Sequence, residues 1–432
     1  MVSEFETHVR PVQRPRKSVC PSRDRLPGSF CYGAMSRSCI FSILFCTGSL
    51  GSLQFRMEVS RLITCKNDRM LELLWFIGYC GELPSQLALR VGGHPEWNRH
   101  VKYRAIQEGY VTVFRGKNRQ RVIRSLRLTE KGIDYISERD PEALAYILSK
   151  NHGGIITRNN MEKTMRRHSL AIGLLMSANA EAEILPGKKP SLMPDAPKVT
   201  PRDWGPIYYS TEEIRAGIQA YEPDTVAKTS RIIGIIVSGN QCFCLYHTGH
   251  SRMYWMRTQE ENTVAAIDAL LTTRGFSCTV FNQVLIGSNL NLAVKISRYK
   301  LNSRSRYFTL SEEYNHCYYL ENSFYGDELL RILIHPELSW KTDRAALVGY
   351  EPPPAWARTC DATENSGRRP VILGYQFDLL KLHELDGVHL GFPQSPILLC
   401  FDYQRDALQA IAGPLIEVRS FSGGLAHERK NE

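Results

Sequence analysis

The sequence predicts an α+β fold, in which a small basic module of helices and one β-hairpin precedes a larger mixed α/β domain. Two observations support this division. The 432 residues carry a net charge of +10, and residues 57–137 hold 14 Lys or Arg against 8 Asp or Glu, whereas the residues after them are nearly neutral. Beyond residue 200, short apolar runs alternate with amphipathic segments, which is typical of strands interleaved with helices.

The composition predicts five segments along the chain. Residues 1–56 are rich in Arg, Pro and Ser and contain an apolar run at residues 38–53. This run is too short for a membrane span and lies too far from Met1 for a leader peptide, so we interpret the segment as a disordered or mis-assigned extension. The other four segments are a basic module at 57–140, a helical linker and loop at 141–206, a mixed α/β domain at 207–421, and a polar tail at 422–432.

The 12 Cys residues are scattered and include no CxxC pair. This spacing argues against a secreted disulfide framework and against a zinc ribbon. The expected location is therefore the reducing cytoplasm, with no membrane contact.

Three short helical patterns open the basic module. Asn67 or Asp68 is expected to cap the first, because a short oxygen-bearing side chain satisfies the free N–H groups at a helix start. Residues 83–91 predict a second, short helix. The glycines at 92–93 predict a turn, after which His-Pro-Glu at 94–96 opens a third helix.

The third helix is expected to have two faces. Val101, Tyr103 and Ile106 are spaced to face the interior. The other side is expected to carry Trp97, Asn98, Arg99, Lys102 and Arg104.

A β-hairpin follows this helix. Gly109 ends the helix, and residues 110–114 alternate like a strand. Residues 115–119 are expected to form the turn, and residues 121–128 return as the second strand. Thr129 is then expected to cap a fourth helix. The hairpin has six cations with no acidic residue between them, namely Arg115, Lys117, Arg119, Arg121, Arg124 and Arg127.

Three helices followed by a cationic hairpin are typical of a winged helix-turn-helix that binds double-stranded DNA. In such modules the third helix enters the major groove, and the cations of the hairpin neutralise phosphates and release counterions. Two alternatives remain open. In the first, the hairpin is a solvated basic surface that binds no ligand. In the second, the module binds another protein.

Residues 109–132, with Gly-Tyr-Val, a basic turn and Leu-Arg-Leu-Thr-Glu-Lys-Gly, resemble the wing and following helix of MarR-like proteins. The layout of residues 57–421 resembles the replication-relaxation family of plasmids and conjugative elements. In the second domain this resemblance rests on residues 208–214, 230–234 and 400–404. It implies a DNA-binding accessory protein in plasmid replication, relaxation or conjugative transfer, with a relaxase or a replication initiator as partner.

The larger domain is expected to begin after a long helix at residues 155–182. The residues that recur on it at three- and four-residue steps are Met161, Met165, His168, Ile172 and Leu175. This stripe indicates core packing, a linker helix or a homodimer contact. Strands 231–237 and 242–247 are expected to form a hairpin at 238–240. Further strands are expected at 252–257, 277–286, 306–310, 317–320, 370–375 and 397–401, and further helices at 209–216, 258–271, 327–334, 376–385 and 404–411.

One alternative function is a metal-dependent nuclease of the PD-(D/E)xK type, which needs carboxylates and a Lys on a short hairpin to hold Mg²⁺ and a water. Pro223-Asp224 supplies the first element, and Asp224 is the one candidate catalytic residue. The strand at 242–247 has no Asp/Glu-x-Lys, and the only matching triplet, at 428–430, lies in the polar tail. A nuclease-like fold that has lost its activity fits these residues better. A third candidate function is a transcriptional regulator that senses a ligand.

Zinc is a second chemical alternative, with Cys242, Cys244, His247 and His250 as candidate ligands. In a strand, Cys242 and Cys244 share one face while His247 points to the other, so tetrahedral coordination would require a bend. Buried core cysteines are the commoner outcome. No phosphate-binding glycine loop, GxSxG or HExxH motif is present. The sequence therefore predicts no cofactor and no metal, and favours a non-enzymatic protein.

Overall fold

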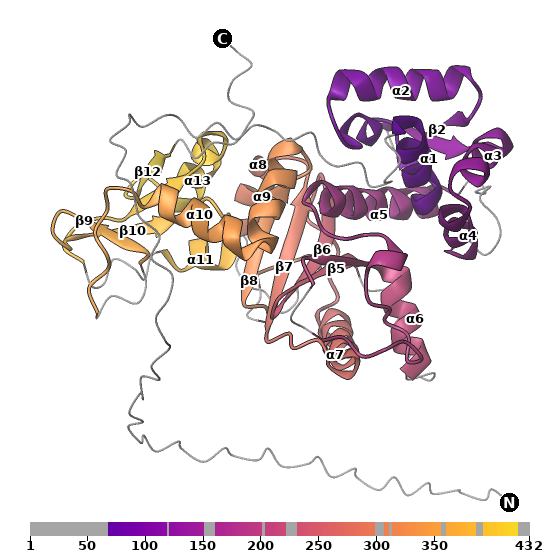
Figure 1. The fold of residues 1–432 in the computed structure, drawn as a ribbon. Helices are drawn as coiled ribbons and strands as arrows, with labels where there is room; N and C mark the ends of the chain where they lie inside the picture. Colours follow the sequence, from indigo (N-terminus) through magenta and orange to yellow (C-terminus); the bar gives the residue numbers. More distant parts are fainter. Residues whose placement is uncertain are drawn as a thin grey trace, which may run out of the picture. The chain divides into compact units, whose positions relative to one another are not determined.

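The protein consists of helices packed on three small β-sheets (Figure 1). A computed structural model describes residues 68–118, 121–150, 160–200, 204–221, 231–298, 306–310, 313–355, 360–385 and 392–421. This mixed architecture confirms the predicted α+β class. Within these ranges, no helix combines the length and the apolar character that crossing a bilayer requires.

The described part of the basic module, residues 68–140, contains the first small sheet, with strand order β1-β3-β2. Its elements, with the helix that follows, are α1 (Arg69–Cys80), β1 (Leu83–Pro84), the 3-10 turn η1 (Leu87–Arg90), α2 (Pro95–Gln107), β2 (Val111–Asn118), β3 (Arg121–Leu128), α3 (Glu130–Arg139) and α4 (Pro141–Lys150).

The helix caps in this module confirm the predictions from sequence. The Asp68 carboxylate accepts hydrogen bonds from the N–H groups of Met70 and Leu71, at 2.9 and 3.0 Å. The Thr129 hydroxyl accepts one from Gly132 N–H at 3.2 Å and so begins α3. Each cap satisfies donors that a helix start leaves free.

Two predictions about the secondary structure of the basic module were wrong. The expected second helix is only the four-residue turn η1, because Leu83 and Pro84 pair with β3 as strand β1. A residue that precedes proline is pushed away from helical backbone angles, which favours the extended Leu83. The expected turn at 115–119 is also displaced, since β2 runs on to Asn118, which pairs with Arg121.

The second sheet is the centre of the larger domain and has the order β4-β5-β6-β7-β8. Strand β5 runs antiparallel to both neighbours, whereas β6, β7 and β8 are parallel. The elements are α5 (Met161–Asn179), η2 (Pro186–Lys188), β4 (Ile207–Ser210), α6 (Thr211–Tyr221), β5 (Ile232–Ser238), β6 (Gln241–Gly249), α7 (Arg257–Arg274), β7 (Val280–Gly287), α8 (Leu290–Ser297), β8 (His316–Glu321), α9 (Phe324–Ile334) and α10 (Pro336–Ala346).

All seven residues of β5 are buried. A strand covered on both faces is expected to show a continuous apolar run rather than an alternating one, and Ile-Ile-Gly-Ile-Ile-Val is such a run. The predicted β5–β6 hairpin is confirmed, with Ser238 opposite Gln241. The strands expected at 252–257 and 306–310 are reduced to one isolated bridge between Tyr254 and Tyr307.

The third sheet has the order β12-β11-β10-β9, with β10, β11 and β12 parallel. Its elements are β9 (Ala362–Glu364), β10 (Arg369–Leu373), α11 (Leu379–His383), β11 (Ile397–Cys400), η4 (Asp402–Gln404), α13 (Arg405–Ala412) and β12 (Glu417–Ser420). The predicted order strand, helix, strand, helix over residues 370–411 is confirmed.

Helix α5 joins the basic module to the second sheet, because it contacts α1 and β1 as well as β5 and β6 (Figure 1). The predicted helix at 155–182 is shorter at its C-terminal end, and residues 151–159 lie outside the described residues. The stripe predicted on this helix includes Ile172 and Leu175, which are buried in the core.

Candidate nucleic-acid interface

Helix α2 presents most of its side chains to solvent. Only Asn98 and Ala105 are fully buried, and α2 packs against α1, η1 and β2. Trp97 is 73% exposed and Tyr103 is 61% exposed. The prediction that Tyr103 faces the interior was therefore wrong, whereas Trp97 lies on the solvent side as expected.

Asn98 is not available to a groove, which corrects its predicted place on the DNA side. Its side-chain amide is 5% exposed and donates hydrogen bonds to the carbonyls of Leu89 and Gly92, at 3.0 and 2.7 Å. Gly92 has a positive φ of 52°. Asn98 therefore fastens the sharp turn that leads into α2, which satisfies carbonyls that a buried turn would otherwise leave free.

The cations of α2 have acidic or carbonyl partners. Arg99 pairs with Glu96 at 2.8 Å and Arg104 with Glu108 at 3.1 Å, and all four side chains are exposed. Exposed pairs of this kind stabilise a helix little, so each guanidinium can exchange its carboxylate for a phosphate.

Lys102 is only half exposed and donates a hydrogen bond to the Ser85 carbonyl at 3.3 Å. Burial, and then the neighbouring Arg99, lower the pKa of Lys102. Lys102 therefore lies at the edge of the candidate interface rather than at its centre.

Three exposed cations share one face of the β2–β3 hairpin, and we call this set the cationic face: Arg115, Lys117 and Arg124. Arg115 and Arg124 are direct cross-strand partners, and residues i and i+2 of a strand share a face. Nearer the base of the hairpin, Val111 and Leu126 on this same face are buried. The face therefore changes from core packing at the base to bare positive charge at the outer end.

Arg127 lies on the opposite face of the hairpin, which corrects its predicted place along phosphates. It forms an ion pair with the fully buried Glu82, and its guanidinium lies over the ring of Phe114 at 3.8 Å. Its side chain is 12% exposed. The alternation of a strand decides this result, because residue 127 points away from residue 124.

The reverse face of the hairpin packs against α5. Ser125 Oγ and His168 Nε2 are 2.7 Å apart, and both side chains are buried. Only one side of the hairpin is therefore free for a ligand.

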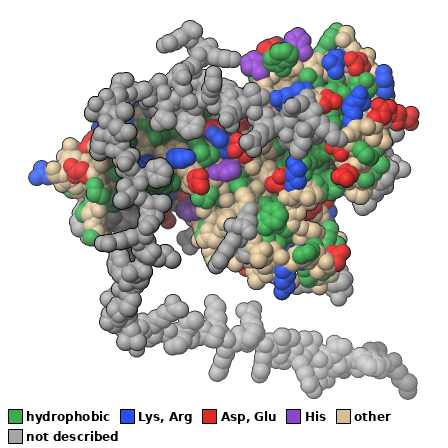
Figure 2. Space-filling model, in the orientation of Figure 1, with side chains coloured by type: hydrophobic (Ala, Val, Ile, Leu, Met, Phe, Trp, Pro, Cys, Tyr) green, Lys and Arg blue, Asp and Glu red, His purple; other side chains and the backbone are tan. Residues whose placement is uncertain are grey.

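Two of the predicted cations lie outside what the structure describes. Arg119 is not among the described residues, and of Arg121 only the backbone is described. Figure 2 shows Lys and Arg side chains interspersed with acidic ones over the basic module. The positive charge is therefore not spread evenly over the surface of this module.

A buried junction that the sequence did not predict fixes the basic module to the larger domain. The Arg90 guanidinium, in η1, forms an ion pair with Asp327 at the start of α9 and donates to Asn322 Oδ1 at 2.5 Å and to the Ser323 carbonyl at 3.1 Å. The Asn179 side chain donates to Asp327 Oδ2 at 2.8 Å and to the Arg90 carbonyl at 3.1 Å. Because η1 directly precedes the turn into α2, this junction sets the position of α2.

The candidate zinc ligands are separated by the sheet. Cys242 and Cys244 lie buried together, and their mutual hydrogen bond and burial raise the pKa of the Cys242 thiol. On the other face, His247 Nδ1 is 2.9 Å from Ser169 Oγ of α5. Within the described ranges, no three His, Cys, Asp or Glu side chains gather in a geometry that would hold a metal ion. A protonated, buried thiol is a poor ligand, and the cysteines act as core residues.

Asp224, the candidate catalytic carboxylate, lies outside the described residues. Strands β5 and β6, which would carry the remaining nuclease residues, contain no Asp or Glu. These two strands therefore supply no carboxylate that could bind a metal ion and its water.

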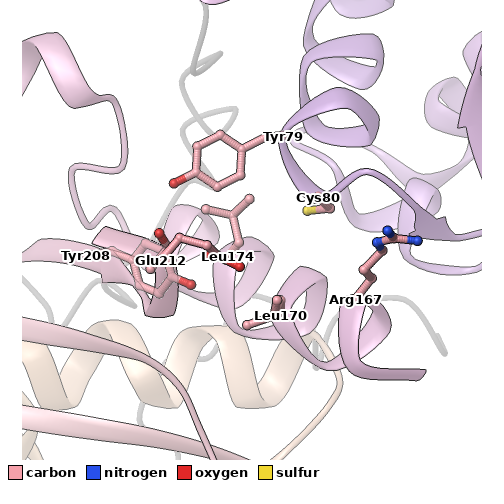
Figure 3. A pocket seen from close by; sticks show the side chains of 8 residues that line it. Tyr79, Cys80, Arg167, Leu170, Leu174, Tyr208 and Glu212 are labelled. Atoms are coloured by element: carbon pink, nitrogen blue, oxygen red, sulfur yellow. The ribbon is translucent and has the colours of Figure 1, made fainter. Parts of the chain in front are cut away.

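Two pockets are formed by described residues. The first, of about 70 Å³, lies where α1, α5 and the β4–α6 region meet, and Figure 3 shows Tyr79 and Tyr208 near Leu174, with Arg167 beside Cys80. The second, of about 270 Å³, lies at the starts of α8, α9 and α13. Pockets for small molecules usually measure about 300–1,000 Å³. Neither of these two pockets reaches that range.

Acid is expected to destabilise the protein as the pH falls from about 6.5 towards 4, because burial lowers the pKa of both His168 and His247 to about 4. In that window the unfolded chain binds protons that the folded protein does not, so stability falls with pH by on the order of 1 kcal/mol per pH unit for each histidine. Urea unfolding at several pH values measures this slope. His168→Gln should reduce the slope by about one proton; an unchanged slope would refute the assignment to His168.

Comparison with known proteins returned no matching family model, no matching curated protein and no matching solved structure. The function is therefore argued from the geometry and the charge of the described residues.

Proposed function

We propose that this protein binds double-stranded DNA through α2 and the cationic face, as a non-enzymatic accessory protein of a mobile genetic element. One observation carries the DNA-binding part. Arg115, Lys117 and Arg124 are exposed together on one face of the hairpin, and within the described ranges none of the three has an acidic partner. Like charges placed opposite each other across two strands destabilise a hairpin, and a polyanion removes that repulsion.

The position of α2 supports the same proposal. It is largely exposed, packs against β2, and is held by the Asn98 and Arg90 hydrogen bonds described above. A rigid, exposed helix beside a cationic hairpin has the layout by which a winged helix-turn-helix places one element in the major groove and the other on the backbone.

The mobile-element part rests on the resemblance of residues 109–132 and 57–421 to the families named above. For the larger domain we propose a degenerate nuclease-like scaffold that recruits a relaxase or a replication initiator. Two features support this reading. The central sheet is mixed, with the single strand β5 reversed, and neither β5 nor β6 carries an acidic residue.

The protein is expected not to cleave DNA. Supercoiled plasmid should stay intact after incubation with the protein and Mg²⁺ or Mn²⁺. Cleavage that Asp224→Ala abolishes would favour the nuclease alternative.

Removing the cationic face is expected to weaken DNA binding and its dependence on salt. The test uses the full chain and a labelled duplex of about 30 base pairs, with fluorescence anisotropy measured from about 50 to about 200 mM salt. For Arg115→Ala/Lys117→Ala/Arg124→Ala, the slope of log affinity against log salt should lose up to about 0.9 per cation, or about 3 in all.

The matched control removes three exposed cations from other parts of the chain, Lys198→Ala/Lys341→Ala/Arg344→Ala. This control changes the net charge by the same amount but leaves the cationic face intact. Its affinity for DNA should therefore fall far less. Equal slopes in the two variants would assign the effect to net charge alone. No binding by the wild-type protein at low salt would overturn the proposed function.

A further inference from the structure

The exposed side of α2 carries a large apolar ring at its start. Trp97 is the third residue of the helix and is 73% exposed. Its side chain forms no hydrogen bond, ring contact or cation–π contact with another described residue. In a helix-turn-helix, the residues at the start of the recognition helix are those that contact base edges.

Towards solvent, the neighbours of Trp97 on the helix surface are polar, whereas Val101, four positions further on, is partly buried against the core. Residues three and seven positions further on lie on the same side of a helix, and these are His100 and Arg104, both exposed. Arg104 carries a charge that suits phosphate, and its present partner Glu108 is exposed. Trp97 is therefore an apolar group set into a polar, solvent-exposed stripe.

The major groove offers one apolar group to such a ring. Adenine, guanine and cytosine present hydrogen-bond donors and acceptors there, whereas thymine adds its C5-methyl group. The indole of Trp97 has one N–H donor and no acceptor, so it cannot match a donor–acceptor pattern, but its face can cover a methyl group and remove it from water.

We propose that Trp97 reads the C5-methyl group of thymine in duplex DNA, and so determines part of the sequence specificity of this protein. This inference rests on the DNA-binding function proposed above. Burial of one methyl group corresponds to about a fourfold change in affinity.

The test compares duplexes that differ only in C5-methyl groups. The first pair is an alternating A·T duplex and the same duplex with deoxyuridine in place of thymidine. The second is an alternating G·C duplex with and without 5-methylcytosine. The wild-type protein should bind the methylated member of each pair about fourfold or more tightly, and Trp97→Ala should bind both members equally.

Trp340→Ala is the matched control, because Trp340 is also exposed, at 56%, but lies on α10. It should keep the preference for methylated duplexes. Circular dichroism of Trp97→Ala should match that of the wild type, since the removed side chain lies at the surface.

The outcomes separate the two claims. Equal wild-type affinity for both members of each pair, or discrimination that survives in Trp97→Ala, would overturn the role of Trp97 and leave DNA binding intact. Tighter binding of the single-stranded oligonucleotide, lost in Trp97→Ala, would assign the ring to base stacking and overturn methyl recognition. No binding to any duplex would overturn the proposed function, and this inference with it.

Discussion

Arg90→Ala is expected to lower the free energy of unfolding by about 3–5 kcal/mol, because it breaks a buried ion pair by removing one partner. Arg90 and Asp327 are 8% and 5% exposed, and Arg90 also donates to Asn322 and Ser323. Burial raises the pKa of Asp327 although Arg90 opposes this rise, so the carboxylate depends on its partner to stay charged. Without Arg90, the Asn179 amide is the one side-chain donor to Asp327 that remains within the described part of the chain.

Urea unfolding of the full chain measures this loss. Arg99→Ala is the control, since Arg99 pairs with Glu96 at the surface of α2, and its expected loss is below about 0.5 kcal/mol. The double variant Arg90→Ala/Asp327→Ala should lose less than the sum of the two single variants, because the second change removes the charge that the first left without its partner. Additive losses would show that the two side chains act independently. A loss for Arg90→Ala as small as that of the control would mean that the pair is open to solvent.

Glu82→Ala is expected to cost a similar amount, about 3–5 kcal/mol, because Glu82 is fully buried beneath two guanidinium groups. It forms an ion pair with Arg127, and Arg167 Nη1 lies 3.9 Å from its carboxylate. Removing the carboxylate leaves the two cations facing each other between the hairpin and α5.

A second variant tests whether the lost stability comes from the unpaired charge of Arg127. Glu82→Leu/Arg127→Leu removes both charges of the pair and should recover part of the stability lost in Glu82→Ala, since an apolar pair of similar volume can replace a buried ion pair. Glu138→Ala, which removes an acid that is 73% exposed and pairs with Arg139, should change the urea midpoint very little. If Glu82→Ala behaved like Glu138→Ala, the burial assigned to Glu82 would be wrong.

Local patterns in the sequence predicted the local structure well where one interaction decides it. The caps at Asp68 and Thr129 and the hairpin at 238–240 each depend on neighbouring residues alone. Elements without such signals were missed, among them α4, α8, α10, β1, β4, β9 and β12. Strands β9 and β12 are too short to show the alternation of apolar and polar residues that predicts a strand. They form because β9 can pair with β10, and β12 with β11.

The sequence by itself determined that this protein is a mixed α+β chain whose positive charge lies in its first third, since composition and periodicity suffice for both. Only the tertiary structure decided which side chains remain at the surface. Arg127 and Arg90 look like candidate DNA contacts or ordinary polar residues in sequence, yet each is buried beside an acid that is distant along the chain, in the case of Asp327 by 237 positions. Asn98 is buried more locally, by hydrogen bonds to carbonyls six and nine positions before it. A buried charge is stable only beside its partner, and long-range packing alone brings that partner within reach.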